Sequence, residues 1–118
     1  MATGTIKAPT VVEVGVNNSC RYEKLSDGTY HAWWLGILSF EAGTAWMNGY
    51  FHRSSVVTAP SFALTVDRVI AGSSSANLAI YCGCNITSKD NIRLYFYDAT
   101  SGAESGRMIM AEIVGTWA

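Results

Sequence analysis

The feature that most constrains this chain is the spacing of its β-branched and aromatic residues, which cluster in short segments separated by Gly, Ser, Asn and Asp. Such segments are typical of strands, and no stretch has apolar residues at the 3.6-residue period of an amphipathic helix. Short strands at regular spacing predict an all-β fold, an antiparallel β-sandwich or jelly-roll-like domain. The expected strands cover residues 10–14, 20–25, 29–39, 45–51, 55–58, 62–70, 77–83, 92–97 and 108–117, with loops at 71–76 and 99–106.

The clearest local signal is the dipeptide Asp27-Gly28 between two strand-like segments. Such a dipeptide predicts a two-residue hairpin, because Gly adopts the positive φ that a type I′ turn requires. In that register Tyr22 lies opposite Trp33. Since successive side chains of a strand point to opposite faces, Trp33 and Trp34 are expected to face opposite sides. One of them then packs inside the sandwich, and the other faces a neighbouring subunit or solvent.

A chain of 118 residues has room for one hydrophobic core, which at this length buries roughly two-thirds of the surface of the unfolded chain. Residues 1–9 carry few groups to bury and are expected to form a short extended N-terminal lead-in, the junction with a stalk if the chain belongs to a fibre. The sequence has no internal repeat and no composition shift that marks a second domain. Residues 10–118 are therefore expected to form a single β-sandwich domain.

The composition limits the kinds of partner. Hydrophobic residues make up 49% of the chain and charged residues only 14%, whereas an ordinary globular domain has about 25% charged residues. Some of the surface must therefore be apolar or neutral, which favours a subunit interface. The net charge is −1 and neither sign forms a run, so no nucleic acid is expected as a partner. No apolar stretch has the roughly 18 residues that a membrane span needs, so no membrane insertion is expected.

The cysteines argue against a disulfide framework and against a metal. Cys20, Cys82 and Cys84 are odd in number, so at least one thiol has no intramolecular partner. The first residues also lack the apolar segment of a secretory signal, and both observations predict synthesis in a reducing cytoplasm. A structural zinc site needs four ligands at matched spacing, which the scattered His31 and His52 do not complete. We expect small buried cysteines, no metal and no other cofactor.

No motif for catalysis stands out. The chain has no Gly-x-Ser-x-Gly nucleophile elbow, and its nine acidic residues are dispersed. We interpret His31 as a packed or surface histidine and expect no catalytic residues and no enzymatic activity. A depolymerase stays open as the least favoured hypothesis. It requires carboxylates such as those of Asp98 and Glu104 to converge in a cleft between subunits.

Aromatic residues are the best candidates for binding, because their flat faces stack on sugars and offer rigid contact area. Within the expected strand 45–51 and the residue that follows it, alternate positions carry two aromatic rings, an amide and an imidazole. Side chains of the same parity share one face of a strand. The sequence therefore predicts a glycan-binding face, with a packing role as the alternative, formed by Trp46, Asn48, Tyr50 and His52.

Five segments in chain order form a recognisable pattern, and they are residues 11–15 (Val-Val-Glu-Val-Gly), 22–29 (Tyr-Glu-Lys-Leu-Ser-Asp-Gly-Thr), 32–34 (Ala-Trp-Trp), 49–51 (Gly-Tyr-Phe) and 113–117 (Ile-Val-Gly-Thr-Trp). Over nearly the whole chain this pattern resembles the C-terminal domain of phage and prophage tail-fibre and baseplate-associated proteins. That family has a Val-Glu-x-Gly entry, a Tyr-x-Lys-Trp-Ser-x-Gly-Thr hairpin and a Cys-Trp shortly afterwards. The sequence departs from the family pattern at Cys20 and Leu25, where the family tends to have Trp, and at Trp33, where it tends to have Cys.

The resemblance implies a β-domain at the distal end of a fibre, usually a homotrimer, that attaches to a bacterial surface glycan or protein alongside other tail and fibre components. Such a protein belongs to the tail tip of the virion and is assembled in the host cytoplasm. A fold does not by itself establish a role. The alternative is a structural trimerisation cap that ends a fibre and has no ligand of its own. An exposed aromatic and polar groove favours attachment, and aromatic residues buried between subunits favour the cap.

Overall fold

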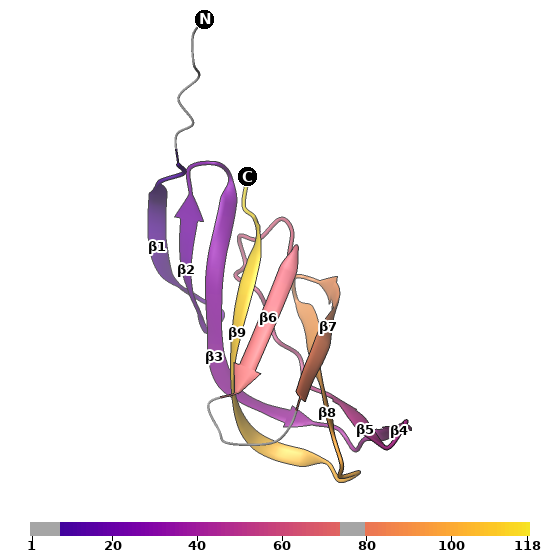
Figure 1. Cartoon of the computed structure of the whole chain (residues 1–118). Coiled ribbons are helices and arrows are strands. Elements are labelled where there is room, and N and C mark those ends of the chain that lie inside the picture. The colour runs from indigo at the N-terminus through magenta and orange to yellow at the C-terminus, as the bar shows by residue number, and fades with distance from the viewer. Residues whose placement is uncertain (1–7, 74–79) are drawn as a thin grey trace, which may run out of the picture.

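The computed structural model describes residues 8–73 and 80–118, and in these ranges the chain forms nine strands and no helix (Figure 1). The strands are β1 (Val11–Asn17), β2 (Cys20–Leu25), β3 (Thr29–Phe40), β4 (Thr44–Trp46), β5 (Gly49–Arg53), β6 (Arg68–Ser73), β7 (Ile80–Ser88), β8 (Asn91–Asp98) and β9 (Glu104–Thr116).

The strands form two antiparallel sheets that pack together. The larger sheet has five strands in the order β1-β2-β3-β9-β6, and the smaller has four in the order β4-β5-β8-β7. The expected all-β, antiparallel sandwich is therefore confirmed. Figure 1 shows the N-terminal end of β1 and the C-terminus at one end of the molecule, and β4 and β5 at the other.

The long strands β3 and β9 form the centre of the larger sheet. They pair from Thr29 opposite Thr116 to Phe40 opposite Glu104. At the far end of this pair, Phe40 meets Phe96 of β8 edge to face, with ring centroids 4.5 Å apart. Edge-to-face ring pairs contribute about 0.5–1.5 kcal/mol beyond the area they bury. The buried cluster that joins the sheets comprises Cys20, Tyr30, Ala32, Leu38, Phe40, Val57, Ala59, Ala63, Ile92, Leu94, Phe96, Ile109 and Ile113.

Residues 54–67 form a crossover segment that runs from β5 in the smaller sheet to β6 in the larger one. Phe62 in this segment packs edge to face on Tyr22 and Tyr30, with centroids 4.6 and 5.4 Å away. Asn17 fixes the segment through its side-chain amide, which donates to Ser61 Oγ and accepts from the Ser61 backbone N–H, both at 2.9 Å.

The strands expected at 55–58 and at 62–67 are therefore wrong. Within 54–67 the structure has only isolated bridges, such as Val57 opposite Ile92, and β6 begins at Arg68. The backbone N–H of Leu64 donates instead to the Thr116 carbonyl at 2.8 Å. The apolar residues of the segment cover one end of the core without joining a sheet.

The β2–β3 hairpin has a three-residue loop, Ser26-Asp27-Gly28, and not the expected two-residue turn. Gly28 has a φ of +88°, and Asp27 Oδ1 accepts a hydrogen bond from the Thr29 backbone N–H at 3.0 Å. A three-residue loop with Gly at the left-handed position is the next most common hairpin connection after the two-residue turn. The glycine was identified correctly, but the length of the loop was not.

This loop shifts the hairpin register by one residue. Tyr22 lies opposite Ala32, and Trp33 lies opposite Arg21, so the expected pairing of Tyr22 with Trp33 is wrong. The two tryptophans do face opposite sides, as expected. Trp34 packs against the core, and Trp33 lies on the outer face, where its ring stacks on His31 at 4.7 Å.

The strand expected at 45–51 is wrong as a single strand, because a turn at Met47 and Asn48 divides it into β4 and β5. The other strand predictions hold, most of them with changed bounds. The strands expected at 10–14, 20–25, 29–39, 92–97 and 108–117 correspond to β1, β2, β3, β8 and β9. Because β9 begins at Glu104 and β6 continues to Ser73, both expected loops are shorter at those ends. The strand expected at 77–83 corresponds to the start of β7. Residues 74–79 of that region and residues 1–7 of the expected lead-in lie outside the described residues.

Substitutions at two glycines of the larger sheet can test how closely the crossover segment packs on β9. A Cβ added to Gly115 would overlap the carbonyl oxygen of Thr65, whereas a Cβ added to Gly72 has nothing within 4 Å. We predict that G115A lowers the free energy of unfolding by about 3 kcal/mol, because the overlapped atom belongs to the backbone. The matched variant G72A should change it by less than about 0.5 kcal/mol. Urea denaturation followed by tryptophan fluorescence measures both, and equal effects would contradict the close packing.

Candidate functional site

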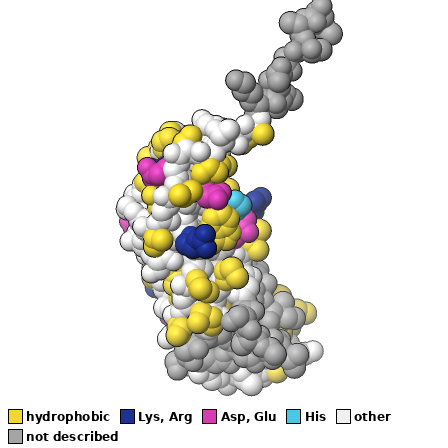
Figure 2. All heavy atoms as spheres, turned by 90° about the vertical axis from the view of Figure 1, so that its left-hand side faces the viewer, with side chains coloured by type: hydrophobic (Ala, Val, Ile, Leu, Met, Phe, Trp, Pro, Cys, Tyr) yellow, Lys and Arg dark blue, Asp and Glu magenta, His cyan; other side chains and the backbone are white. Residues whose placement is uncertain are grey.

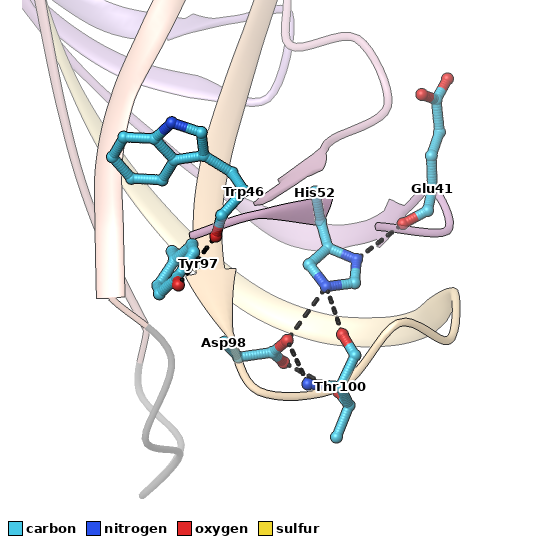
Figure 3. Close-up of polar contacts among 6 residues, drawn as sticks. All are labelled: Glu41, Trp46, His52, Tyr97, Asp98 and Thr100. Carbon is cyan, nitrogen blue, oxygen red and sulfur yellow. Dashed lines mark hydrogen bonds and ion pairs between the residues drawn. The ribbon is translucent and has the colours of Figure 1, made fainter. Parts of the chain in front are cut away.

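The four residues expected to share one binding face do not share it. Met47 and Asn48 form a tight turn between β4 and β5, and Met47 has a φ of +54°. The turn interrupts the alternation, so equal parity no longer means a common face. Trp46 is 57% exposed and His52 is fully buried, and their rings point apart in Figure 3. Tyr50 is half-buried on the face of β5 that His52 occupies, and Asn48 is exposed in the turn.

His52 is the centre of a buried polar network and not a ligand-facing residue. Its Nδ1 lies 2.8 Å from the Glu41 carbonyl oxygen, and its Nε2 lies 3.0 Å from Asp98 Oδ1 and 2.9 Å from the Thr100 carbonyl oxygen (Figure 3). The ring also stacks on Phe96 at a centroid distance of 4.5 Å. The network joins β5 to the segment after β3 and to the loop after β8.

The partners of His52 determine its protonation. Carbonyl oxygens only accept hydrogen bonds, so the carbonyls of Glu41 and Thr100 require a proton on each ring nitrogen. Burial by itself lowers the pKa of His52, but the hydrogen bonds to Glu41, Asp98 and Thr100 and the charge of Asp98 outweigh burial and raise that pKa above its usual value. We therefore assign an imidazolium that is paired with the Asp98 carboxylate.

An aromatic groove of about 370 Å³ lies on the outer face of the smaller sheet and is lined by Trp46, Phe51, Gly83, Cys84 and Tyr95. Phe51 and Tyr95 come from neighbouring strands, β5 and β8, and their ring centroids are 6.3 Å apart. Gly83 of β7 lies opposite Tyr95, and a Cβ added there would meet nothing within 4 Å. The absent side chain leaves the groove open at that strand.

The Trp46 ring is held in place at one end of the aromatic groove. It packs edge to face on Tyr97 at a centroid distance of 5.7 Å, and Tyr97 Oη donates to the Trp46 carbonyl at 3.0 Å (Figure 3). Gly49 makes this possible, because a Cβ there would come within 2.5 Å of the Tyr97 ring. Of the four predicted residues, only Trp46 therefore lines the groove.

Sequence reasoning missed Phe51, Tyr95 and Gly83. The alternation of apolar residues in β8 could have identified Tyr95. Ile92, Leu94 and Phe96 are buried, so the residues between them, Tyr95 among them, must face outward. The missing information was the turn after Trp46, which places Phe51 and not Tyr50 on the outer face.

The chain was compared with protein-family models, curated proteins and solved structures. No family model matches the chain, and no curated protein and no solved structure matches it either.

The outer face of the larger sheet carries exposed apolar side chains on β1, β3, β9 and β6, and the charged Arg21 and Glu23 of β2 lie between those of β1 and β3. Six side chains on this face are between 54% and 73% exposed, and they are Val14, Val16, Leu35, Ile37, Ile70 and Met110. Figure 2, which views the molecule from the β1 side, shows hydrophobic side chains spread over the surface, with charged side chains and a histidine gathered among them in its upper half. Soluble monomers rarely expose contiguous apolar patches of more than a few hundred Å². We call these six residues the apolar sheet face.

Other groups considered for chemistry are engaged in the structure. Burial raises the pKa of the Cys20 thiol to about 11, which leaves little reactive thiolate at neutral pH. Asp98 pairs with His52, and the side chains of Glu104 and Cys82 lie outside the described part of the chain. Among the described residues no group of three or more His, Cys, Asp or Glu side chains is placed to hold a metal ion. In the same residues no helix is long and apolar enough to cross a membrane.

The His52 network predicts how stability depends on pH. A raised pKa in the folded state means that the stabilisation is complete below the unfolded pKa of about 6.5 and is lost as the pH rises through the folded pKa. We predict that the free energy of unfolding falls as the pH rises from 6 to 9. Urea denaturation at intervals of one pH unit measures it.

A variant of His52 identifies the group responsible. H52Q removes the imidazolium, so its stability should be lower at pH 6 and should lose most of the pH dependence that the wild type shows over this range. A free energy of unfolding that rises with pH in the wild type would contradict the assignment.

Proposed function

We propose that this chain is the tip domain of a phage or prophage tail-fibre or baseplate-associated protein. In this proposal it assembles as a homotrimer and attaches to a bacterial surface receptor, a glycan or a protein, without catalysis. The tail tip of the virion is then its location, with assembly in the host cytoplasm next to other tail and fibre components. The resemblance of the β1 entry and the β2–β3 hairpin to that family supports this proposal.

The apolar sheet face is the observation that carries the proposal. Burying apolar area stabilises an assembly by roughly 25 cal/mol per Å² removed from water, and interfaces are apolar and poor in charge at their centre. Leu35 and Ile37 on β3 lie opposite Met110 and Met108 on β9, so the exposed residues are contiguous across the central strand pair. A cyclic homo-oligomer covers such a face with identical copies.

The positions of the chain ends agree with a fibre tip. The backbone N–H groups of Ser26 and Trp117 donate to the carbonyls of Thr10 and Gly28, both at 2.8 Å. The first described residues, the β2–β3 loop and the C-terminus therefore lie together. The aromatic groove is bordered by the β4–β5 hairpin, at the other end of the molecule (Figure 1). A stalk joined before β1 would leave that hairpin pointing outward.

We predict that the chain has the mass of three copies in light scattering coupled to size exclusion, at micromolar concentration under reducing conditions. L35K should reduce the mass to that of one copy, because a lysine at the centre of the apolar sheet face loses hydration when the face is covered. L64K is the matched control, since Leu64 is 68% exposed but lies in the crossover segment. A monomeric wild type would overturn the trimer.

Adsorption to bacteria tests the attachment role separately. The labelled trimer should bind cells of a susceptible strain and compete with the parent virion for them. A trimer that adsorbs to none of a panel of strains would favour the structural cap, which the apolar sheet face alone also explains.

A further inference from the structure

We infer that the aromatic groove binds a neutral saccharide, which stacks the apolar face of a sugar ring between Trp46 and the Phe51–Tyr95 pair. This inference deepens the attachment function proposed above and depends on it for its biological context. It assigns the ligand class and the place of contact, which the proposal leaves open.

The lining of the aromatic groove selects flat, partly polar ligands. Three of the five described lining residues present aromatic rings, and the same described lining contains no Leu, Ile, Val or Met side chain. Aromatic faces stack on the C–H face of a sugar, while a phenolic group such as that of Tyr95 offers a hydrogen bond to its hydroxyls. The volume of about 370 Å³ lies at the small end of the range for small-ligand sites.

The charges near the aromatic groove favour a neutral ligand. None of the lining residues that the structure describes is charged. The charges of the two neighbouring arginines on the same strands already interact with Glu41. Arg53 forms two hydrogen bonds with the Glu41 carboxylate. Arg93 donates to the Ser54 carbonyl at 3.0 Å, and its charge also helps to lower the pKa of Glu41. An anionic sugar would have to compete with these interactions, whereas a neutral one leaves them intact.

The aromatic groove is also formed before any ligand arrives. Trp46 is fixed by Tyr97 on one side, and Gly83 leaves its neighbourhood open without the movement of a side chain. Rings that are already placed lose little conformational freedom on binding, and this reduces the cost of association. A site with these properties can hold a weakly bound sugar, and three copies in one tip would raise the avidity.

The experiment uses the whole chain and a panel of oligosaccharides of known composition. Neutral hexose and N-acetylhexosamine oligomers are compared with uronic-acid oligomers of the same length, first on an array and then by NMR titration to millimolar concentration. The expected result is binding of at least one neutral oligomer in preference to its acidic counterparts. A hit whose NMR shifts map to Phe51, Gly83 and Tyr95 supports the assignment.

Two variants at the same turn separate the role of the ring from that of the fold. W46A should weaken binding of the best neutral oligomer at least tenfold, the size of effect expected from one lost stacking contact. M47A changes the adjacent exposed residue and should bind like the wild type. The NMR spectra of both variants show whether they are folded. Unchanged affinity in a folded W46A would overturn the inference.

The remaining outcomes separate this inference from the proposed function. If no neutral oligomer binds but the trimer still adsorbs to cells, and W46A adsorbs equally well, the groove assignment is wrong and the attachment proposal stands. The groove assignment is also wrong if another copy of the chain fills the groove in the trimer. Fluorescence quenching detects this outcome, because Trp46 would then be shielded from the quencher. If the chain neither assembles nor adsorbs, the proposed function fails, and the oligosaccharide titration still decides the ligand class.

Discussion

The pairing of β3 with β9 is the constraint on which the rest of the structure depends. At one end of this pair, Tyr30 and Gly115 contact the crossover segment, and Tyr30 Oη donates to the Thr65 carbonyl at 2.9 Å. At the other end, Phe40 packs on Phe96 of the smaller sheet and bridges to Ser54. One antiparallel ladder therefore positions both the crossover segment and the second sheet. Neither could be shifted along the ladder without exposing a large aromatic ring.

The same strand pair explains the unusual composition. An antiparallel sheet with one face in water alternates between apolar and polar side chains, whereas a sheet covered on both faces is apolar throughout. The inner face of β3 carries Tyr30, Leu38 and Phe40, and its outer face carries Leu35 and Ile37. The apolar sheet face therefore accounts for part of the low charge of the chain, and exposed hydrophobic side chains such as Trp46, Met47 and Leu64 add to it elsewhere on the surface. A strand that is apolar on both sides is typical of burial on both sides.

The sequence predicted the fold class because strand patterning is local, and it failed where tertiary contacts decided. Gly28 identified a hairpin, but nothing local distinguished a two-residue turn from a three-residue loop, and a shift of one residue changes every cross-strand pair. Phe62 was read as part of a strand because an apolar residue that covers a core end has the same local signature as one in a sheet. The binding face failed for a related reason. Asn48-Gly49 is a hairpin signal that the expected continuous strand passed over, and the turn that forms is centred one residue earlier, on Met47 and Asn48, although Met47 is a poor candidate for a residue with positive φ.

His52, which the sequence predicts to contact a glycan, instead supports the aromatic groove from the buried side. It follows Phe51 in β5, so the two side chains lie on opposite faces of the same strand. From the buried side, His52 binds the segment before β4 through the Glu41 carbonyl and the loop after β8 through Asp98 and Thr100. These bonds fix the approach to the β4–β5 hairpin, in which Trp46 is the last residue of β4. A buried, charged network is costly unless every member is paired, and here each ring nitrogen has an acceptor. The network thus gives the exposed rings a rigid base, which is what a preformed stacking site requires.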